Sequence, residues 1–340
     1  MAYTTIDDPT LYFNTVLYTG TGATHNITGV GFQPDWVWIK NRSITANHHL
    51  FDIARGATKY LLTNVTNAEA TDAQQLQSFD ADGFTVGTNG NVNGSGNNIV
   101  AWNWLGANAS SSNTDGSITS SVSANTTAGF SIVSYTGTGA NATVGHGLGS
   151  ALDMVIVKNR DDVANWKVWH NYLSGTQVLE LNNTDAVETP AVWNSTIPTS
   201  SVFSVGTQNT VNGSGDNIIA YCFAEKKGYS KFGSYTGNGN ADGTFVYTGF
   251  KPAFVITKKS SNTGNWLMYD NKRDSDNVVN ATLNPNLSNA ESSVDTMDFT
   301  AQGFKLRRSL DPNTSATTYI YMAFAENPFV SSTGIPTTAR

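Results

Sequence analysis

Short apolar runs separated by polar turn residues recur along the whole chain. Typical runs are Trp36–Lys40, Met154–Lys158 and Phe254–Lys258, which are rich in β-branched and aromatic residues. Runs of this length and composition, bounded by Gly, Asn, Asp or Pro, indicate β-strands. Met154–Lys158 is almost continuously apolar, which predicts a central strand buried on both faces. No apolar stretch approaches the roughly 18 residues of a transmembrane helix, so we expect no membrane insertion.

The same runs recur at fixed spacing. A Tyr-Thr-Gly-Thr/Asn-Gly motif starts at Tyr18, Tyr135 and Tyr235, and a lysine closes an apolar run 22 or 23 residues later. Further along come three phenylalanines, each followed 20 residues later by another aromatic residue: Phe84 and Trp104, Phe203 and Phe223, Phe304 and Phe324. Self-similarity at a fixed period is the signature of a repeat architecture.

The repeats predict an all-β chain of three tandem β-sandwich modules of a jelly-roll or concanavalin-like type. Six or seven short strands fit each stretch of about 100 residues. We expect modules at residues 1–106, 128–227 and 228–330. The Ser/Thr/Asn-rich residues 107–127 indicate a linker, and residues 331–340 indicate a disordered tail. One short helix is expected at Phe51–Leu62, with Asp52 as its cap.

Each module is expected to close its own aromatic core. The repeated aromatic positions supply the candidates for the three cores: Tyr18, Trp36, Trp38 and Trp104; Tyr135, Trp166, Phe203 and Phe223; Tyr235, Trp266, Phe304 and Phe324.

Composition narrows the possible environments. Charged residues make up 13% of the chain, against about 25% in an average soluble protein. The formal net charge of −7 argues against a nucleic-acid partner. Cys222 is the single cysteine, so no intrachain disulfide forms and the residue is expected in the core. Met1 to Asp8 lacks a basic and an apolar region, which predicts no signal peptide.

Residues suited to catalysis or metal binding do not form a known pattern. The Gly-Ser-Gly turn at Gly94 does not match the nucleophile elbow of hydrolases. His48, His49 and His170 lack the spacing of convergent metal ligands. Asp274-Ser275-Asp276 offers carboxylates for weak calcium binding, without a known loop pattern. The sequence therefore predicts no enzyme, no metal centre and no cofactor.

A cationic strand end is the candidate binding feature. Five residues carry it at equivalent positions of the repeats: Lys40, Arg42, Lys158, Arg160 and Lys258. Residues two apart on a strand point the same way, so each Lys/Arg pair could grip a sugar or an anionic headgroup. The alternative is a charged cap that ends the strand and discourages edge pairing.

Several segments resemble uncharacterised structural proteins of marine tailed phages. The resemblance covers nearly the whole chain, and the segments that carry it are Tyr3–Pro9, Gly31–Asp35, Phe51–Gly56, Ser78–Phe84, Asn113–Thr127, Gly228–Tyr235 and Tyr321–Phe329. In such proteins the modules look like concanavalin- or SPRY-like sandwiches of tail fibres and other virion components. The third repeat departs from the pattern, because Ala253 replaces an aspartate and the Asn-Gly-Ser-Gly turn is missing.

The resemblance implies a virion protein that is made in the host cytoplasm. Its expected partners are other virion proteins of the tail or capsid and a host surface glycan, and the chain is expected to form a homo-oligomer on the virion. Three functions stay open: a tail-fibre adhesin, a capsid decoration or head knob, and a polysaccharide depolymerase. The decoration alternative is favoured by the possibility that three modules in one chain mimic a trimer on a three-fold site.

Overall fold

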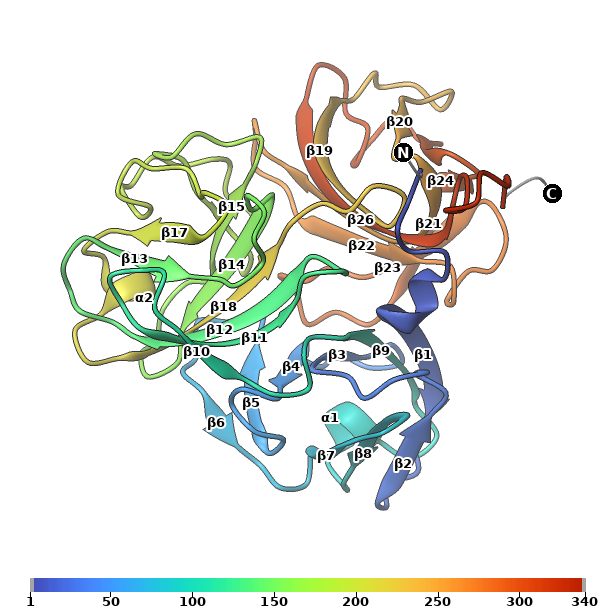
Figure 1. Ribbon diagram of the computed structural model, residues 1–340. Helices are drawn as coiled ribbons and strands as arrows, with labels where there is room; N and C mark the ends of the chain where they lie inside the picture. The colour runs from blue at the N-terminus through green and yellow to red at the C-terminus, as the bar shows by residue number, and fades with distance from the viewer. Residues whose placement is uncertain (1–2, 338–340) are drawn as a thin grey trace.

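The computed structural model describes residues 3–337 and has an all-β sandwich fold, as expected. Three lobes surround a common centre (Figure 1). In each lobe one antiparallel sheet faces the centre and a second sheet lies on its outer side; the inner sheet is the larger in lobes 1 and 2, whereas both sheets of lobe 3 have four strands. Among the described residues, no helix is long and apolar enough to span a membrane.

The three lobes are defined by their strands. Lobe 1 contains η1 (Pro9–Leu11), β1 (Phe13–Thr19), β2 (His25–Thr28), β3 (Trp36–Asn41), β4 (His49–Asp52), β5 (Lys59–Leu62), β6 (Ala70–Thr71), β7 (Leu76–Asp80), β8 (Gly83–Val86), α1 (Gly90–Asn93) and β9 (Asn98–Trp104). Lobe 2 contains β10 (Ser111–Asn113), β11 (Ser120–Asn125), β12 (Phe130–Thr136), β13 (Ala142–Gly145), β14 (Met154–Asn159), β15 (Lys167–His170), β16 (Leu179–Glu180), β17 (Val202–Val205), α2 (Asn209–Asn212) and β18 (Asn217–Phe223). Lobe 3 contains β19 (Ser230–Thr236), β20 (Phe245–Tyr247), β21 (Phe250–Lys259), β22 (Trp266–Asp270), β23 (Val279–Thr282), β24 (Ser292–Thr300), β25 (Gly303–Leu306) and β26 (Thr318–Pro328).

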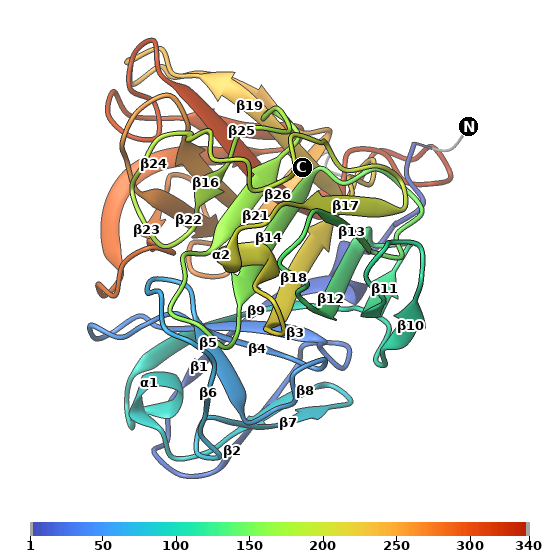
Figure 2. The same cartoon turned by 90° about the vertical axis from the view of Figure 1, so that its left-hand side faces the viewer.

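The inner sheets repeat one strand order. Figure 2 shows β12, β18 and β14 of lobe 2 side by side. The orders are β1-β9-β3-β4, β12-β18-β14-β15 and β19-β26-β21-β22, and every pairing is antiparallel. The register is also equivalent. The pairs Trp36–Trp104, Met154–Phe223 and Phe254–Phe324 lie at the same position of the three sheets, each joining β3, β14 or β21 to the last aromatic residue of the neighbouring strand. The expected central strand at Met154–Lys158 is confirmed: all six residues of β14 are buried, and β14 pairs on both sides.

Alternation along β3 decides which core each side chain enters. Val37 and Ile39 join the core of lobe 1, whereas Trp36 and Trp38 point to the centre of the molecule. There the ring of Trp36 lies 4.5 Å from that of Tyr221, a residue of lobe 2.

One central core therefore joins the three lobes. It contains aromatic residues from each of them, namely Phe13, Trp36, Trp38, Trp102 and Trp104; Phe130, Trp166, Tyr221 and Phe223; Phe232, Phe254, Trp266 and Phe324. The expectation of a separate aromatic core in each module is corrected for Trp36, Trp38, Trp104, Trp166, Phe223, Trp266 and Phe324. Tyr18, Tyr235 and Phe304 do pack within the cores of their own lobes.

The repeated Tyr-Thr-Gly motif ties two turns of each lobe together. The hydroxyls of Tyr18, Tyr135 and Tyr235 donate to the backbone carbonyls of Val92 (2.6 Å), Val211 (2.7 Å) and Pro312 (2.8 Å). The residue after each acceptor is a buried asparagine, whose side-chain oxygen accepts a hydrogen bond from a backbone N–H of the Tyr-Thr-Gly turn. The three asparagines are Asn93, Asn212 and Asn313. The third lobe therefore keeps this contact although its Gly-Ser-Gly turn is missing.

The expected linker at residues 107–127 is ordered and forms part of lobe 2. Its strands β10 and β11 extend the inner sheet beyond β12. The side chain of Asp35 holds the segment in place, because it accepts hydrogen bonds from the backbone of Asn108 (2.8 Å) and the hydroxyl of Ser123 (3.1 Å).

Asp153 makes the equivalent contact to Glu225 N (2.6 Å), where the chain leaves lobe 2. In lobe 3 the strand β26 continues to Pro328 and pairs with the start of β21. No exit turn lies beside Ala253, and an aspartate there would have no such segment to bind.

Two further expectations are corrected. Phe51–Leu62 is no helix but the end of β4, a turn and β5, with Asp52 accepting from Arg55 N in the turn (2.9 Å). Residues 331–337 of the expected disordered tail are placed against the N-terminal segment, where Ser332 N donates to Asp7 (2.6 Å). Residues 338–340 of that tail lie outside the described range.

The shared core gives a testable prediction. Replacing Trp36 by alanine should lower the free energy of unfolding by about 3–5 kcal/mol, because a fully buried Trp is lost. Hydrogen exchange should also accelerate in β18 of lobe 2, which supplies Tyr221. The control is Phe84→Ala, since Phe84 is equally buried but lies in the core of lobe 1 alone. Equal protection of β18 in both variants would contradict a shared core.

Candidate functional site

The three strand-end lysines are buried and bind backbone carbonyls. Lys40 Nζ donates to Ala46 O (2.8 Å) and to Ser288 O of lobe 3 (3.2 Å). Lys258 Nζ donates to Asp185 O of lobe 2 (2.8 Å), and Lys158 Nζ to the nearby Asn159 O (2.6 Å). Burial lowers the pKa of each of the three amines to about 8, so all of them remain largely protonated at neutral pH.

The two arginines form ion pairs between lobes. Arg42 of lobe 1 binds Glu291 of lobe 3 with two nitrogens, at 2.9 and 2.6 Å. Arg160 of lobe 2 binds Glu69 of lobe 1 in the same way, at 2.8 and 2.9 Å. Such bidentate pairs fix geometry as well as charge.

Lys40, Lys258 and the two arginines therefore belong to contacts between the lobes, whereas Lys158 binds carbonyls of its own lobe. Their charged groups are occupied within the chain, and the three lysines are fully buried. The geometry gives no support to a sugar or anion grip by Lys40, Arg42, Lys158, Arg160 and Lys258. We call the three contact regions seams: seam 1/2, seam 2/3 and seam 3/1, each named after its two lobes.

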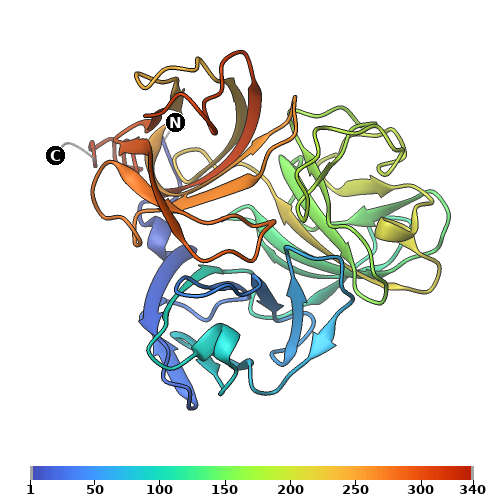
Figure 3. The same ribbon diagram turned by 180° about the vertical axis from the view of Figure 1, so that it is seen from behind.

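Equivalent backbone bonds close all three seams. A residue six positions after each buried lysine donates its N–H to a carbonyl of the lobe that precedes it around the ring. The three bonds are Ala164 N to Thr66 O (2.9 Å), Gly264 N to Thr184 O (2.8 Å) and Ala46 N to Ser288 O (2.8 Å). The lobes thus form a closed ring with pseudo-three-fold symmetry, which Figure 3 shows from behind.

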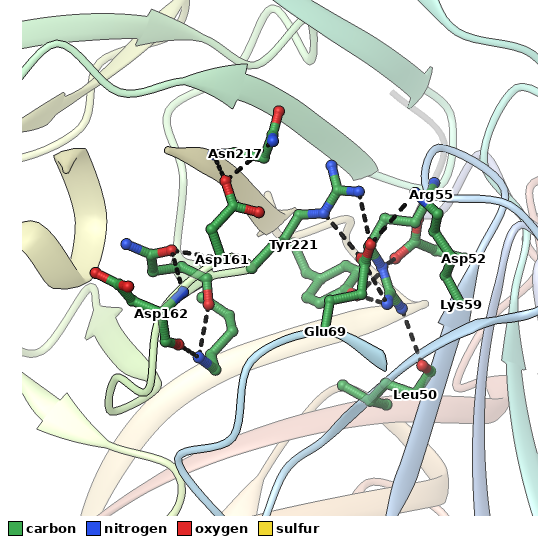
Figure 4. A network of polar contacts seen from close by, with 12 residues as sticks. Leu50, Asp52, Arg55, Lys59, Glu69, Asp161, Asp162, Asn217 and Tyr221 are labelled. Atoms are coloured by element: carbon green, nitrogen blue, oxygen red, sulfur yellow. Dashed lines mark hydrogen bonds and ion pairs between the residues drawn. The ribbon is translucent and has the colours of Figure 1, made fainter. Parts of the chain in front are cut away.

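Seam 1/2 contains a buried network of charges, drawn in Figure 4. Asp52 accepts from Arg55 Nε (2.5 Å) and from the hydroxyl of Tyr221 in lobe 2 (2.7 Å). Arg55 also contacts Glu69 (3.4 Å), which in turn binds Arg160. Lys59 also reaches Glu69 (3.5 Å) from a more exposed position. The buried part of the network pairs two carboxylates with two guanidinium groups, so no buried charge there stands alone.

Seam 3/1 repeats this network with different residues. Asp270 accepts from Arg273 Nε (2.5 Å) and from Trp102 Nε1 of lobe 1 (3.0 Å). Arg273 binds Glu291 (2.9 Å), which also holds Arg42. The guanidinium of Arg273 additionally lies 5.5 Å from the centroid of the Trp102 ring.

Seam 2/3 has lost all four charged residues together. The backbone bond Val187 N to Ser260 O (3.0 Å) matches Glu69 N to Arg160 O (2.7 Å), and this match identifies the equivalent positions. His170 and Leu173 take the places of the Asp and Arg of the other seams. A single unpaired buried charge costs several kcal/mol, which explains why the four positions differ as a set.

His170 is a neutral substitute for the aspartate. Its Nε2 lies 3.1 Å from Tyr321 O of lobe 3. Burial lowers the pKa of His170 to about 4, and the bond to Tyr321 opposes this only in part. The imidazole is therefore neutral at physiological pH, and seam 2/3 carries no charge at these four positions.

The spacing of the repeats predicted the positions of the lysines, Arg42 and Arg160, but not those of their acidic partners. An Asp-x-x-Arg motif recurs at Asp52 and Asp270, each followed later by a glutamate, and this recurrence could have pointed to the acids. Only the fold shows that these residues meet those of another lobe. Within residues 3–337, no three His, Cys, Asp or Glu side chains come together to hold a metal ion.

Comparison with known proteins gives one family match. A family model with the description "Domain of unknown function (DUF7483)" matches residues 8–328. The match includes every strand of the three lobes, so the ring as a whole corresponds to one family unit. No curated protein matches the chain.

The seam network predicts strong coupling between Arg160 and Glu69. The variants Arg160→Ser and Glu69→Val each leave a buried charge poorly paired, whereas the double variant removes both charges and places the residues of seam 2/3 at these two positions. A double-mutant cycle in urea should give a coupling energy of about 1–3 kcal/mol. Lys231→Ser and Glu225→Val are the control, because that pair lies within lobe 3 and its connection and is more exposed. Its coupling should stay below about 1 kcal/mol; similar values for both pairs would contradict the buried network.

The lowered pKa of His170 predicts that acid reduces the stability of seam 2/3. Its pKa is lower in the folded protein than the usual 6.5, so unfolding takes up a proton between pH 6.5 and about 4. Stability contributed by neutral His170 is therefore present above pH 6.5 and decreases as the pH falls through this window. As the pH falls, the free energy of unfolding of His170→Gln should decrease less steeply than that of the unchanged protein. The two slopes should differ by up to about 1.4 kcal/mol per pH unit. Urea titrations from pH 7 to pH 4 measure both slopes, and parallel slopes would refute the assignment.

Proposed function

Since the chain belongs to the DUF7483 family, whose description assigns no activity, we propose that it is a non-catalytic structural protein on the surface of a bacteriophage particle. The observation that carries the proposal is the closed ring of three lobes. The buried seams fix the lobes relative to one another, as suits a building block that must present constant surfaces. The phage assignment rests on the sequence resemblance described above.

The use of the perturbed side chains supports a role without catalysis. Residues whose pKa values depart from the usual range are candidates for catalysis when they line an accessible cleft. Here Lys40, Lys158, Lys258 and His170 are buried and bind seam carbonyls. Their chemistry therefore stabilises the ring, and the depolymerase alternative gains nothing from them.

The position on the particle that fits best is a capsid site of local three-fold symmetry. The chain provides three similar lobes around one pseudo-three-fold axis, so each could contact one of three neighbouring capsid subunits. The partners would then be capsid proteins, and several copies would decorate each head.

A tail-fibre adhesin that contacts host glycans is the second candidate. One observation favours it: the outer sheet of lobe 3 exposes Phe245 and Tyr247, which are 46% and 55% accessible. Exposed aromatic side chains are common at recognition surfaces.

Imaging of purified particles tests the proposal. Gold-labelled antibodies against the full chain should decorate the head of the phage that encodes it. Antibodies against an unrelated host protein are the control. Labelling confined to the tail would favour the adhesin instead, and absence of the chain from purified particles would contradict both positions.

A further inference from the structure

The chain before β12 covers one side of the lobe 2 sandwich, because it bonds to the outer edge of β13. Ile118 N donates to Thr143 O (3.0 Å), and Thr143 N donates to the hydroxyl of Ser117 (2.9 Å). The hydroxyl of Ser120 donates to Gly145 O (2.9 Å). An extended segment with small polar side chains thus satisfies backbone groups at the edge of β13.

The same segment also covers the inner sheet of lobe 2. It continues as β11, in which Ser121 pairs with Ser134 of the neighbouring β12 (Figure 2). Val122 and Ala124 of β11 then lie against Gly147, which follows β13. One stretch of chain therefore joins the edges of the two sheets in lobe 2.

The pairing register identifies the equivalent edges of lobe 3. The matching pairs are Val144–Phe203 and Val246–Phe304 in the outer sheets, and Ser134–Ile219 and Ser234–Ile320 in the inner sheets. Phe245 and Tyr247 of β20 therefore correspond to Thr143 and Gly145. Ser234 of β19 corresponds in the same way to Ser134.

These edges are open in lobe 3. Thr244 O and Thr248 N bond to β25 and the turn before it, so Phe245 and Tyr247 direct their N–H and C=O groups to the other side. Ser234 faces away from β26 by the same alternation. β19 and β20 are the last strands of their sheets, and no residue between 3 and 337 bonds to these outward backbone groups. All three residues are exposed.

The N-terminal segment covers only the neighbouring part of lobe 3. Tyr3 Oη donates to Gly249 O (2.7 Å) and lies against Gly249, the counterpart of Gly147. Tyr3 thus takes the place that side chains of β11 have in lobe 2. The open part of lobe 3 therefore corresponds to residues 117–121 of lobe 2.

The side chains around the open edge are apolar or paired. The rings of Phe245 and Tyr247 are exposed, and Lys305 opposite Phe245 is paired with Asp242 (2.6 Å). Native edge strands are usually protected by charges, proline or a covering segment, and β20 itself carries neither charge nor proline. Such an edge favours an uncharged strand over a charged ligand.

We propose that the open edge of lobe 3 binds an extended, uncharged segment of a partner protein by strand addition. The segment lies along β20 and Ser234 as residues 117–121 lie in lobe 2. Its backbone pairs with Phe245 and Tyr247, whose rings flank it, and small hydroxyl side chains bond the remaining groups. The partner segment is therefore rich in Ser and Thr, with a β-branched apolar residue where lobe 2 has Ile118. This inference goes beyond the proposed structural role, which requires no such edge.

A peptide with the sequence of residues 113–121 is the probe, because this segment covers the equivalent edge of lobe 2. The ¹⁵N-labelled peptide is titrated with the full chain, and its amide chemical shifts are followed by NMR. We expect saturable shifts that are largest around Ile118, with a Kd below about 1 mM. A peptide with Ile118→Pro lacks the N–H that bonds Thr143 O in lobe 2, and it should bind at least about threefold more weakly.

Two substitutions at one position separate the backbone from the side chain. Phe245→Ala removes the ring and keeps the N–H, whereas Phe245→Pro also removes the N–H, which makes no bond to β25. Phe245→Pro should bind the peptide at least about threefold more weakly than Phe245→Ala. Asn26→Pro is the matched control, because Asn26 holds the same position on β2 of lobe 1, and it should bind as the unchanged chain does. Thermal unfolding midpoints check the fold of each variant, and the peptide variant decides the question if Phe245→Pro unfolds.

Three results would overturn the proposal: no saturable shift with up to about 1 mM chain, equal binding by Phe245→Pro and Phe245→Ala, or equal weakening by Asn26→Pro and Phe245→Pro. Sedimentation of the chain alone tests a second copy as the occupant. A dimer that Phe245→Pro dissociates would assign the edge to self-association and overturn the partner proposed here. Antibody labelling of the particle does not depend on this edge, so failure here leaves the proposed function standing.

Discussion

Neutralisation of buried charge at the seams is the constraint on which the rest of the structure depends. Each lobe must turn one face of its inner sheet toward the other lobes, and that face ends in a lysine whose amine is buried. Carbonyl oxygens from the same and the neighbouring lobe receive the amines. Around them, two seams balance two acids against two arginines, while the third carries neutral residues at all four positions. Removing only one member of an acid–arginine pair would leave a lone buried charge, which is costly.

The central core converts three sandwiches into one body. Trp36 and its equivalents leave the cores of their own lobes and pack against rings from neighbouring lobes. A lobe taken alone would expose this aromatic face to water, at a cost that grows with the apolar area. The ring therefore behaves as a single structural unit, in agreement with a family match that spans all three lobes. Such a unit presents fixed surfaces to its partners, which is the basis of the proposed role on a particle.

Lobe 3 departs from the symmetric plan on its outer side, where the seams impose no constraint. Its outer sheet has more strands than those of the other lobes and carries exposed aromatic rings. Its inner side has the same buried lysine and tyrosine hydrogen bond as the other lobes. The inner faces of the three lobes are therefore alike and their outer faces differ, which suits a molecule whose lobes share one scaffold.

The amino-acid pattern was enough to place local strands. The almost continuous apolar run at Met154–Lys158 places β14 correctly, and the spacing of the tyrosines and lysines marks equivalent positions, because strand patterning depends on neighbours in the chain. It failed at Phe51–Leu62, where two strands around a turn imitate helical spacing, and at residues 107–127, whose polar strands gain order from pairing with β12. The packing of the lobes alone reveals that Trp36 faces another lobe and that Arg160 meets Glu69, 91 residues away in the chain. Periodicity tells which residues share a face of a strand, but what covers that face depends on how the lobes associate.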